Sequence, residues 1–431
     1  MKNNKIAVIG LGYVGLTFAI SLAKVGFEVL GIENNEKIFK SMLKGKAQFY
    51  EENIDKFLIK TQKNKRLKIE NNLDNVKKCK TVFITLGTPV NDNKKINLKN
   101  LFNLINELKN KLNNRSILVL RSTVKIGTTK KIENILNKNK KIFLAMCPER
   151  TAEGSALKEI HYLPQIIGCG SDYVKKELGI IFKKITKKII FFNSYKEAEI
   201  LKLIDNSYRD TIFGFANELA RIGEYYNIDI LNVIDKIKID YPRSNIALPG
   251  TVGGPCLTKD PHILVESVKN KLNLPIISSA RHTNENLTIE ILKMIKTKLN
   301  KRITKILVCG VAFKGLPTTS DIRGSLATEV IKQTKKLFYN PRIDVLDKYV
   351  SEEDAKKINN DSKFFKNFES INEKYNFILI LNNSHYWKDV GYKKFSNKLF
   401  NKGIIYDFWS SFKKDKYKKN YFRFGGGDLF S

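Results

Sequence analysis

The sequence predicts an α/β protein with two doubly wound, Rossmann-like domains and a long helical segment between them. Up to residue 195, short apolar runs alternate with helical or lysine-rich stretches, which is typical of a parallel sheet covered by helices. The stretch 196–226 has no proline, few glycines and dense apolar residues, as expected of one long helix. A second unit of strand and glycine begins at 305–310, so we expect a second, smaller sheet.

In the first domain, residues 5–9 form a short apolar run of the kind that a buried parallel strand needs. A helix is expected over 13–25 and a second strand over 28–33. The further strands expected in this domain are 81–86, 117–121, 142–146 and 165–168.

Beyond the long helix, more helix is expected up to about residue 299, interrupted by a Gly- and Pro-rich loop at 241–261. The strands expected in the second domain are 305–310, 343–347, 377–381 and 404–408. Residues 410–431 form a basic, aromatic, glycine-rich tail with no clear period. The expected domains are 1–195, 196–300 and 301–431.

The formal net charge of +34 has two interpretations. The lysines are spread along the whole chain among many asparagines and isoleucines, which indicates a bias toward A/T-rich codons. The alternative is electrostatic attraction of an anionic partner, either a nucleic acid or a doubly anionic nucleotide sugar. The apolar fraction of 42% is that of an ordinary globular protein in either case.

The cysteines and the start of the chain indicate a cytoplasmic protein. The five cysteines have no paired spacing, which argues against a disulfide framework and against a zinc site. Residues 1–25 superficially resemble a signal peptide, but glycines at 10, 12 and 15 break the apolar run and no cleavage site follows. No stretch is long and apolar enough to span a membrane, so we expect no membrane partner and no metal.

The run Gly10-Leu11-Gly12-Tyr13-Val14-Gly15 follows a strand and opens a helix, as dinucleotide-binding turns do. Its first glycine allows the tight turn, its second lets backbone N–H groups reach a pyrophosphate, and its third allows close helix–strand packing. Glu33, after the second strand, can accept hydrogen bonds from a ribose diol and favours NAD over NADP. Lys37 nearby weakens that preference. Thr85–Pro89 and Arg121–Thr123 end later strands, at the edge where such sheets bind ligands.

The run Val252–Pro261 contains Cys256, and we identify it as a candidate covalent centre. The two glycines before the thiol leave the backbone bare for a close approach of substrate. Lys259 lowers the pKa of a neighbouring thiol, and Asp260 supplies a proton-transfer group. A nucleophilic cysteine together with a nicotinamide cofactor points to oxidation through a thioester. The alternative is a structural cysteine buried in a Gly-Pro turn.

Two further segments carry polar side chains in patterns that suit catalysis. Glu199, Lys202 and Asn206 fall at i, i+3 and i+7 of the long helix and share one face. A lysine and an amide there could polarise an oxyanion, although a solvated polar face has the same pattern. The segment Cys147–Gly154 carries two carboxylates, of which one could be a general base; the alternative is a loop with a charged rim.

Together these motifs resemble the UDP-glucose/GDP-mannose dehydrogenase family. The blocks that match in order are Gly10–Gly15, Ser122–Thr128, Pro148–Gly154, Glu197–Asn206 and Gly253–Asp260. The resemblance implies two NAD-binding-like domains, the second a UDP-binding one, joined by a long central helix within a helical region that forms a homodimer. It also implies oxidation of a nucleotide-sugar C6 alcohol to a carboxylate with two NAD⁺, in surface-polysaccharide synthesis.

The resemblance implies a role for each matching residue. Cys256 would trap the C6 aldehyde as a thiohemiacetal that becomes a thioester, and Lys202 and Asn206 would stabilise the oxyanion. Asp260 would handle protons through water, and Glu149 would be the base for thioester hydrolysis.

The remaining site residues follow from the same resemblance, which gives Thr123 the role of positioning a water. The expected cofactor-binding residues are Gly10, Gly12, Tyr13, Val14, Gly15, Glu33, Thr88 and Thr123. The expected substrate-binding residues are Glu149, Arg150, Glu153, Lys202, Arg243, Asn245, Gly253, Lys259, Lys314 and Arg323. Arg243, in the loop 241–245, would reach the substrate of the neighbouring subunit.

The chain departs from the family pattern at a few positions. Glu33 replaces the usual Asp, Lys125 replaces the usual Pro, and the tail after Asp407 lacks a usual basic residue, which leaves C-terminal nucleotide contacts open. The segments 148–154 and 243–245 favour a UDP-N-acetylhexosamine over UDP-glucose or GDP-mannose, while N-acetylglucosamine and N-acetylmannosamine stay equally open. Outside the family, the alternatives are a basic nucleic-acid-binding protein with a Rossmann core and an NAD-binding regulator without catalysis.

Overall fold

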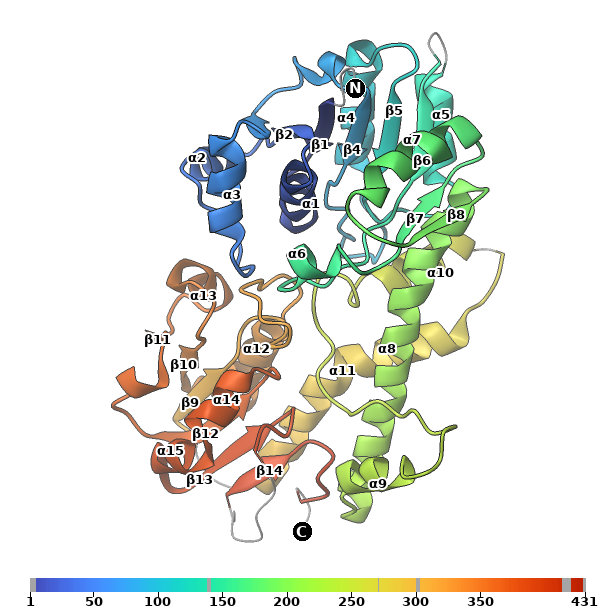
Figure 1. Ribbon diagram of the computed structural model, residues 1–431. Helices are drawn as coiled ribbons and strands as arrows, with labels where there is room; N and C mark the ends of the chain where they lie inside the picture. Colours follow the sequence, from blue (N-terminus) through green and yellow to red (C-terminus); the bar gives the residue numbers. More distant parts are fainter. Residues whose placement is uncertain (1–4, 138–140, 270, 300–302, 413–419, 429–431) are drawn as a thin grey trace. The chain divides into compact units, whose positions relative to one another are not determined.

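The computed structural model describes residues 5–137, 141–269, 271–299, 303–412 and 420–428. The chain divides into two compact units, whose elements are labelled in Figure 1. Unit 1 consists of 1–205 and 262–273, and unit 2 consists of 206–261 and 274–431. Helices α8 (Tyr195–Tyr226) and α10 (Asp260–Val268) each have residues in both units. The three-domain division expected from the sequence stays a prediction.

Unit 1 is built around a sheet whose strands run in the order β3-β2-β1-β4-β5-β6-β7-β8. The strands are β1 (Lys5–Ile9), β2 (Glu28–Ile32), β3 (Leu67–Glu70), β4 (Thr81–Ile84), β5 (Ile117–Leu120), β6 (Phe143–Met146), β7 (Gln165–Gly168) and β8 (Ile189–Phe192). Among these described strands the pairings are parallel except between β6 and β7, which pair antiparallel at Met146 and Gly168. The strand order reverses at β1, which is where such sheets bind ligands.

The apolar runs form strands because both faces of this sheet are covered. In β1, Ile6 and Val8 pack into one buried cluster and Ala7 and Ile9 into a second one. The helices and 3₁₀ turn of this unit before α8 are α1 (Tyr13–Lys24), α2 (Glu36–Leu43), α3 (Ile54–Lys63), η1 (Val76–Lys78), α4 (Lys99–Lys111), α5 (Thr128–Leu136), α6 (Ala156–Glu159) and α7 (Asp172–Lys183). A strand buried on both faces reads as a continuous apolar run, which is why the sequence predicted it.

The expected strands of this sheet are confirmed to within two residues at each end. β3 and β8 were not expected. In β3, buried Leu67 and Ile69 alternate with exposed Lys68 and half-buried Glu70, so it has no continuous apolar run. β8 is an edge strand in which Ile190 and Phe191 are 43% and 46% exposed. The antiparallel pair at β7 also departs from the all-parallel sheet that the alternation predicted.

Unit 2 holds a second, wholly parallel sheet among the described residues, in the order β11-β10-β9-β12-β13-β14. Its strands are β9 (Lys305–Cys309), β10 (Arg342–Leu346), β11 (Phe364–Phe365), β12 (Tyr375–Ile380), β13 (Leu399–Asp407) and β14 (Tyr421–Arg423). Its helices and 3₁₀ turn, besides residues of α8 and α10, are α9 (Ile230–Ile237), α11 (Pro275–Lys298), α12 (Ala327–Leu337), α13 (Glu352–Ile358), η2 (Phe368–Ser370), α14 (His385–Val390) and α15 (Tyr392–Asn397).

Two expectations for unit 2 need correction. β13 begins at Leu399, five residues before the expected 404. The sequence does not predict this start because residues 400–402 are exposed, so the first part of the strand has no continuous apolar run. The tail after residue 410 is not wholly irregular: β14 pairs with β13, and Phe412 and Phe424 are buried. Phe412, Tyr421 and Phe424 of this tail therefore belong to the core, while 413–419 and 429–431 lie outside the described residues. Within the described residues, no helix has the length and apolar character needed to cross a membrane.

Candidate functional site

The turn after β1 forms the cradle that the glycine pattern predicted. Gly10 has φ +89°, and its N–H donates to the carbonyl oxygen of Ile32 at 2.8 Å. A Cβ on Gly15 would lie 1.8 Å from the Gly10 oxygen, so only glycine allows helix α1 to approach this strand. Gly12 precedes the first turn of α1 and has open space around its Cβ position. This combination of an open backbone and a helix N-terminus fits the pyrophosphate of a dinucleotide.

Glu33 lies at the end of β2, where the sequence placed a ribose-binding acid. The side chain is buried, one oxygen accepts from the Leu11 N–H at 3.0 Å, and the other accepts from the Asn35 N–H at 2.9 Å. Each carboxylate oxygen has a further lone pair for a ribose hydroxyl. Tyr13 and Val14 are half-buried in the first turn of α1, where Tyr13 stacks on Phe49 with ring centres 3.9 Å apart.

Two later strand ends meet beside this turn. The Thr88 hydroxyl donates to the carbonyl oxygen of Thr123 at 2.6 Å, which joins the loop after β4 to the loop after β5. Thr85 donates to the carbonyl oxygen of Gly10 at 2.6 Å and so joins the same loop to the glycine turn. The cofactor-binding residues expected from the sequence therefore converge on one edge of the first sheet.

Glu149, in the loop after β6, is a buried carboxylate held ionised by its partners. It pairs with Arg121, whose side chain is fully buried, and accepts N–H donors from Arg150 at 2.7 Å and Thr151 at 2.9 Å. Burial would raise the pKa of Glu149, but the Arg121 guanidinium and these hydrogen bonds outweigh it and hold the pKa below its ordinary value. The sequence analysis names Arg121 only as the start of a segment that ends a strand. A cation directly after the apolar run 117–120 was the sequence signal that could have identified it as a site residue.

Two other carboxylates fix the same loop, and neither was expected from the sequence. Glu51 accepts the N–H donors of Gly154 at 2.8 Å and Leu157 at 3.0 Å. Glu159 accepts the N–H of Ala152 at 2.7 Å. The loop that carries Glu149, Arg150 and Glu153 is thus fixed through its backbone, because these N–H groups have no strand to pair with. Arg150 and Glu153 are both half-buried.

The polar face expected on α8 divides between structural and chemical roles. Glu199 is buried and accepts the N–H donors of Gly127 at 2.6 Å and Thr129 at 2.7 Å, which caps helix α5. Lys202 is half-buried and lies one turn before Asn206, which is buried. The helical spacing was therefore read correctly, while Glu199 serves the loop that follows Thr123.

Cys256 is exposed, and it stands apart from the other cysteines of the chain. Cys79, Cys147, Cys169 and Cys309 are buried. Burial raises the pKa of each of these four thiols, that of Cys79 to about 11. The alternative of a buried structural cysteine at position 256 is therefore wrong.

The glycines before Cys256 have a different reason from the one that the sequence suggested. A Cβ on Gly253 would lie 2.8 Å from the carbonyl oxygen of Gly324, and a Cβ on Gly254 would lie 2.4 Å from the ring of Phe313. Gly254 also has φ +96°, and its N–H donates to the Gly324 oxygen at 2.8 Å. Close packing against the second sheet's loops requires these glycines.

Asp260 gathers the polar groups around the cysteine loop. It is fully buried at the start of α10 and accepts from the Asn206 amide at 2.5 Å and from the Lys259 ammonium at 2.6 Å. The Asp260 N–H donates to the carbonyl oxygen of Cys256 at 2.9 Å. The structure thus brings Cys256, Asn206, Lys259 and Asp260 together, as expected, and it pairs Lys259 with a carboxylate.

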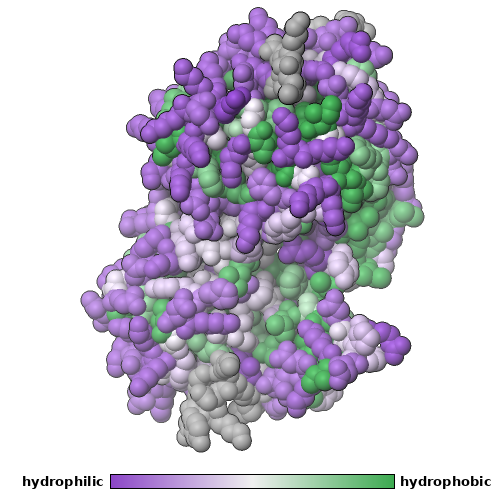
Figure 2. Space-filling view, viewed as in Figure 1, coloured by the Kyte–Doolittle hydropathy of each residue, from purple (hydrophilic) through white to green (hydrophobic). Residues whose placement is uncertain are grey.

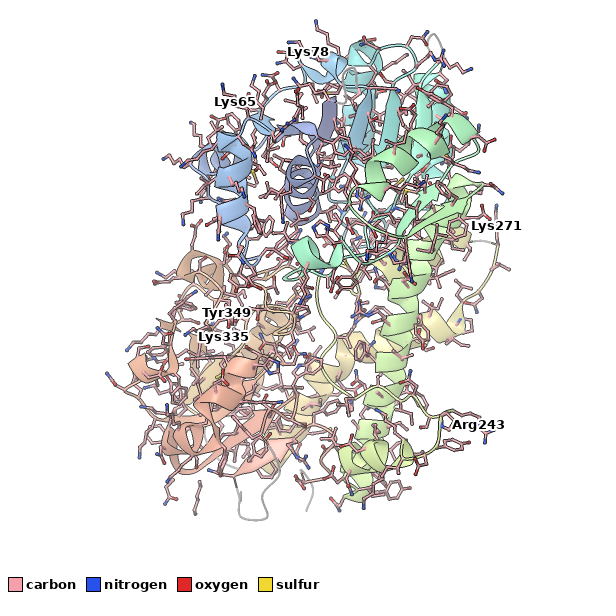
Figure 3. The ribbon with its side chains drawn as sticks, viewed as in Figure 1. Lys65, Lys78, Arg243, Lys271, Lys335 and Tyr349 are labelled. Atoms are coloured by element: carbon pink, nitrogen blue, oxygen red, sulfur yellow. The ribbon has the colours of Figure 1, made fainter. Side chains whose placement is uncertain are left out.

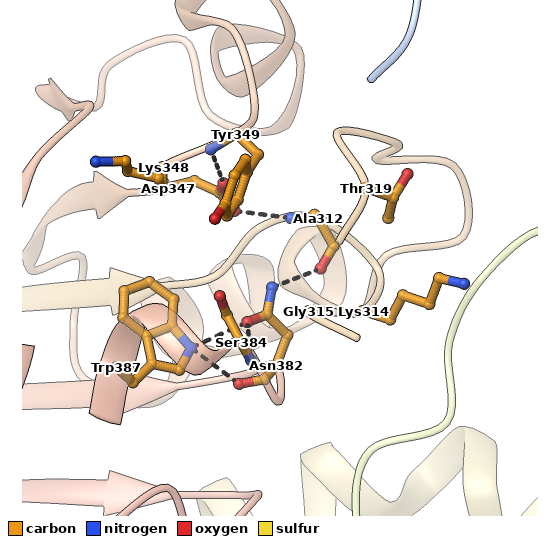
Figure 4. A pocket seen from close by; sticks show the side chains of 10 residues that line it. All are labelled: Ala312, Lys314, Gly315, Thr319, Asp347, Lys348, Tyr349, Asn382, Ser384 and Trp387. Atoms are coloured by element: carbon orange, nitrogen blue, oxygen red, sulfur yellow. Dashed lines mark hydrogen bonds between the residues drawn. The ribbon is translucent and has the colours of Figure 1, made fainter. Parts of the chain in front are cut away.

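The loops beside Phe313 and Gly324 carry the two expected nucleotide-binding residues of the second domain. Lys314 is half-buried and lines a small pocket at the carboxyl ends of β9, β10 and β12 (Figure 4). The other residues of this pocket include Asp347, Lys348, Tyr349, Asn382 and Trp387, none of which the sequence reasoning named. Arg323 grips Asp321 with two nitrogens, at 2.6 to 3.0 Å, and leaves half of its side chain exposed.

Arg243 and Asn245 are not brought to these groups within the chain. Both are exposed on the loop between α9 and α10, where Figure 3 shows Arg243 turned outward. The Arg243 guanidinium carbon lies 4.9 Å from the ring centre of Tyr241. Among the residues that the structure describes, no three or more His, Cys, Asp or Glu side chains are arranged to hold a metal ion.

Comparisons with known proteins match this arrangement. The NAD-binding, central and UDP-binding domains of the UDP-glucose/GDP-mannose dehydrogenase family match residues 4–186, 196–286 and 307–414. The UDP-N-acetyl-D-mannosamine dehydrogenase of Methanocaldococcus jannaschii is 34% identical over 334 residues, 76% of each chain. The UDP-N-acetyl-D-glucosamine 6-dehydrogenase of Salmonella typhi is 27% identical and covers 94% of this chain and 95% of its own.

A solved structure shows the same fold over the whole chain. The UDP-D-ManNAc dehydrogenase of Pyrococcus horikoshii superimposes with a TM-score of 0.87 at 27% identity, covering 98% of this chain and 100% of its own. The glycine turn, Glu33 and the three matching domains therefore have one explanation. The chain is an NAD-dependent oxidoreductase that belongs to the UDP-glucose/GDP-mannose dehydrogenase family.

Proposed function

We propose that the chain oxidises the C6 alcohol of a UDP-N-acetylhexosamine to the carboxylate through a covalent intermediate on Cys256. The observation that carries the proposal is the contrast among the cysteines: this thiol alone among the five is exposed, and it lies in the loop that Asp260 closes. Relatives that act on N-acetylated UDP-sugars support the substrate class. The segments 148–154 and 243–245 favour the same class over UDP-glucose and GDP-mannose.

The reaction removes four electrons: RCH₂OH, two NAD⁺ and water give RCOO⁻, two NADH and three protons. NAD⁺, held by the glycine turn and Glu33, supplies hydride acceptance at both steps. The Cys256 thiolate adds to the C6 aldehyde carbon to form a thiohemiacetal, whose oxidation leaves a thioester. Water then breaks the C–S bond, which releases the carboxylate and restores the thiolate.

The polar groups around Cys256 divide the remaining work. One N–H of the Asn206 amide donates to Asp260, and we assign the other, together with Lys202, to the oxyanion. Asp260 orients this amide and receives protons through water. From the family resemblance we assign Glu149, which is ionised, and Thr123 to the hydrolytic water; the lowered pKa of Glu149 makes it a weak base, so hydrolysis depends on a reactive thioester.

The test is a panel of UDP- and GDP-sugars incubated with NAD⁺, with NADH followed by absorbance and the product identified by mass spectrometry. Two NADH per sugar and a uronic acid from UDP-N-acetylmannosamine or UDP-N-acetylglucosamine are expected. Preference for UDP-glucose or GDP-mannose would contradict the substrate class. One NADH per sugar with a ketone product would contradict the thioester mechanism as well.

We also infer that two copies of the chain form a dimer through α8. Ile204, Tyr208, Phe215 and Ile222 form a stripe on this helix, and each is 50 to 60% exposed. Figure 2 shows apolar side chains gathering near β8 and the first turns of α8. An exposed apolar stripe of this length on a helix is typical of a protein–protein interface. In such a dimer the exposed Arg243 would reach the substrate bound to the partner subunit. We place the protein in the cytoplasm, where NAD⁺ is available and thiols stay reduced.

A further inference from the structure

The loop that carries Cys256 is held at both of its ends by side chains from two helices. At its start, the Gly250 N–H donates to the Asn217 side-chain oxygen on α8 at 2.9 Å. At its end, the Leu257 carbonyl oxygen accepts from the Arg281 guanidinium on α11 at 2.9 Å. Leu257 directly follows Cys256, so Arg281 fixes the peptide group one residue beyond the one that joins Cys256 to Leu257.

Between these two ends the holding side chains are joined to one another. The Asn217 amide donates to the Asn284 side-chain oxygen at 2.8 Å, and the Asn284 amide donates to Asp210 at 2.9 Å. Arg281 donates to the same Asp210 oxygen at 2.7 Å. We call Asp210, Asn217, Arg281 and Asn284 the clamp. A continuous chain of hydrogen bonds therefore runs from Gly250 to Leu257 through the clamp.

The clamp is buried, so a change in its geometry would break hydrogen bonds that water cannot replace. Its four side chains are between 0 and 2% exposed. A buried ion pair is weak evidence for stability, because desolvation offsets most of its attraction, but a buried network with fixed partners permits one arrangement. Asp210 lies one turn after Asn206 on α8, so the same stretch of helix carries one clamp residue and the amide that donates to Asp260.

We propose that the clamp is a positioning network that fixes Cys256 for the second oxidation. The inference rests on the proposed function, because it assumes the thioester route. Conversion of the alcohol to the aldehyde needs no thiol, whereas capture of the aldehyde needs the sulfur within bonding reach of one carbon. A displacement of about 1 Å at a reacting group costs on the order of 100-fold in rate. A loosened clamp therefore lets the aldehyde leave before the thiol adds to it.

The test variant is Arg281→Lys, which keeps the positive charge but is shorter and so withdraws the nitrogen, Nη1, that donates to both Asp210 and Leu257. The matched control is Arg423→Lys, at a buried arginine of the same unit that pairs at 2.8 Å with Asp229, a residue outside the clamp. Asn217→Ala removes the hydrogen bonds to Gly250 and Asn284 but keeps the ion pair of Arg281 with Asp210, so it serves if Arg281→Lys does not fold.

Two measurements separate positioning from general damage. The first is the ratio of NADH formed to sugar consumed, with escaping aldehyde trapped by a hydrazine and identified by mass spectrometry. The second is the rate of Cys256 alkylation by iodoacetamide without substrate. We expect a ratio near two for the wild type and for Arg423→Lys. For the clamp variants we expect trapped aldehyde, a ratio approaching one, an oxidation of added aldehyde that is about 10- to 100-fold slower, and an altered alkylation rate.

Clamp variants that keep a ratio of two and the wild-type alkylation rate would overturn the inference. So would equal slowing of both oxidations in Arg281→Lys and Arg423→Lys, because that result describes lost stability alone. If the wild type itself oxidises no UDP-sugar twice, the proposed function fails, whereas unchanged alkylation in the clamp variants identifies a failure of the clamp.

Discussion

Removing the guanidinium from the buried pair of Arg121 and Glu149 tests how this site controls its carboxylate. In Arg121→Met the new side chain fills similar space against Phe18, whose ring centre lies 4.3 Å from the guanidinium carbon. Glu149 then keeps only the two backbone N–H donors that the structure gives it, at 2.7 and 2.9 Å. Breaking one side of a buried pair costs about 3 to 5 kcal/mol, against a total of about 5 to 15 kcal/mol for a domain.

The pH dependence gives the sharper result, because the pKa of Glu149 should change direction. In the wild type this pKa is lowered, so its contribution to stability is present above the ordinary carboxyl pKa and is lost as pH falls through the folded value. Without Arg121, burial prevails and raises the pKa. The variant's free energy of unfolding should then decline as pH rises above about 4.5, where the unfolded carboxyl ionises and the folded one does not.

The assay is urea unfolding of wild type, Arg121→Met and Glu149→Gln between about pH 4 and pH 8, with turnover measured over the same range. We expect the acid limb of turnover to move to higher pH in Arg121→Met, since Glu149 has to be ionised for the role proposed for it. Glu149→Gln has no titrating group and should show neither effect. If Arg121→Met loses less than about 1 kcal/mol and keeps the wild-type pH profile, the assigned ion pair does not control this carboxylate.

Three further substitutions have defined outcomes. Cys256→Ser should abolish double oxidation and keep NAD⁺ and UDP-sugar binding, while the control Cys79→Ser should retain turnover. Mass spectrometry after mixing with substrate detects any trapped ester. Near-normal activity of Cys256→Ser would exclude the thioester. Gly15→Ala should weaken NAD⁺ binding by at least about tenfold in calorimetry, because its Cβ would lie 1.8 Å from a carbonyl oxygen; unchanged affinity would show that the turn adapts. Phe215→Glu should shift the sedimentation of the proposed dimer toward that of the monomer. The control Phe400→Glu, at a side chain on β13 that is 43% exposed, should not change the sedimentation. If the two variants sediment alike, the dimer interface does not involve Phe215.

Local chemistry made some features predictable from the sequence. Strands buried on both faces are continuous apolar runs, so β1 and β7 were found with their observed ends. The glycine turn and the spacing of Lys202 and Asn206 depend on neighbours within two turns, and these were read correctly. β8 was missed although Ile189–Phe192 is a continuous apolar run, of the kind that predicts a strand.

Contacts between distant parts of the chain were not predictable in the same way. Glu51 meets the N–H of Gly154 across about a hundred residues, and nothing near either residue signals the other. Gly254 was read as a gap for substrate, whereas the Phe313 ring and the Gly324 oxygen decide that no side chain fits there. Sequence reasoning identified which residues were unusual, and the folded chain supplied the reason.

Each sheet has a similar glycine turn after its central strand, but the hydrogen bonds of the two turns differ. After β9, Gly310 has φ +85° and its N–H donates to the Leu346 carbonyl oxygen at 2.9 Å, as in the first turn. Here, however, one oxygen of Asp347 accepts both N–H groups of the turn, those of Val311 at 2.9 Å and Ala312 at 3.1 Å. No helix follows at once, since α12 begins only at Ala327. The N–H groups of Val311 and Ala312, which would face a pyrophosphate, are therefore hydrogen-bonded to Asp347 instead.

Within the described residues, the chain thus has one turn suited to a dinucleotide, whereas the proposed reaction consumes two. In that reaction the reduced cofactor would leave and an oxidised one would enter between the half-reactions, while a reactive aldehyde is present. In the proposed mechanism, a bond to Cys256 would keep that aldehyde on the protein during the exchange. The covalent bond would therefore act as a timing element: it would let a single cofactor-binding turn serve two successive oxidations of one sugar.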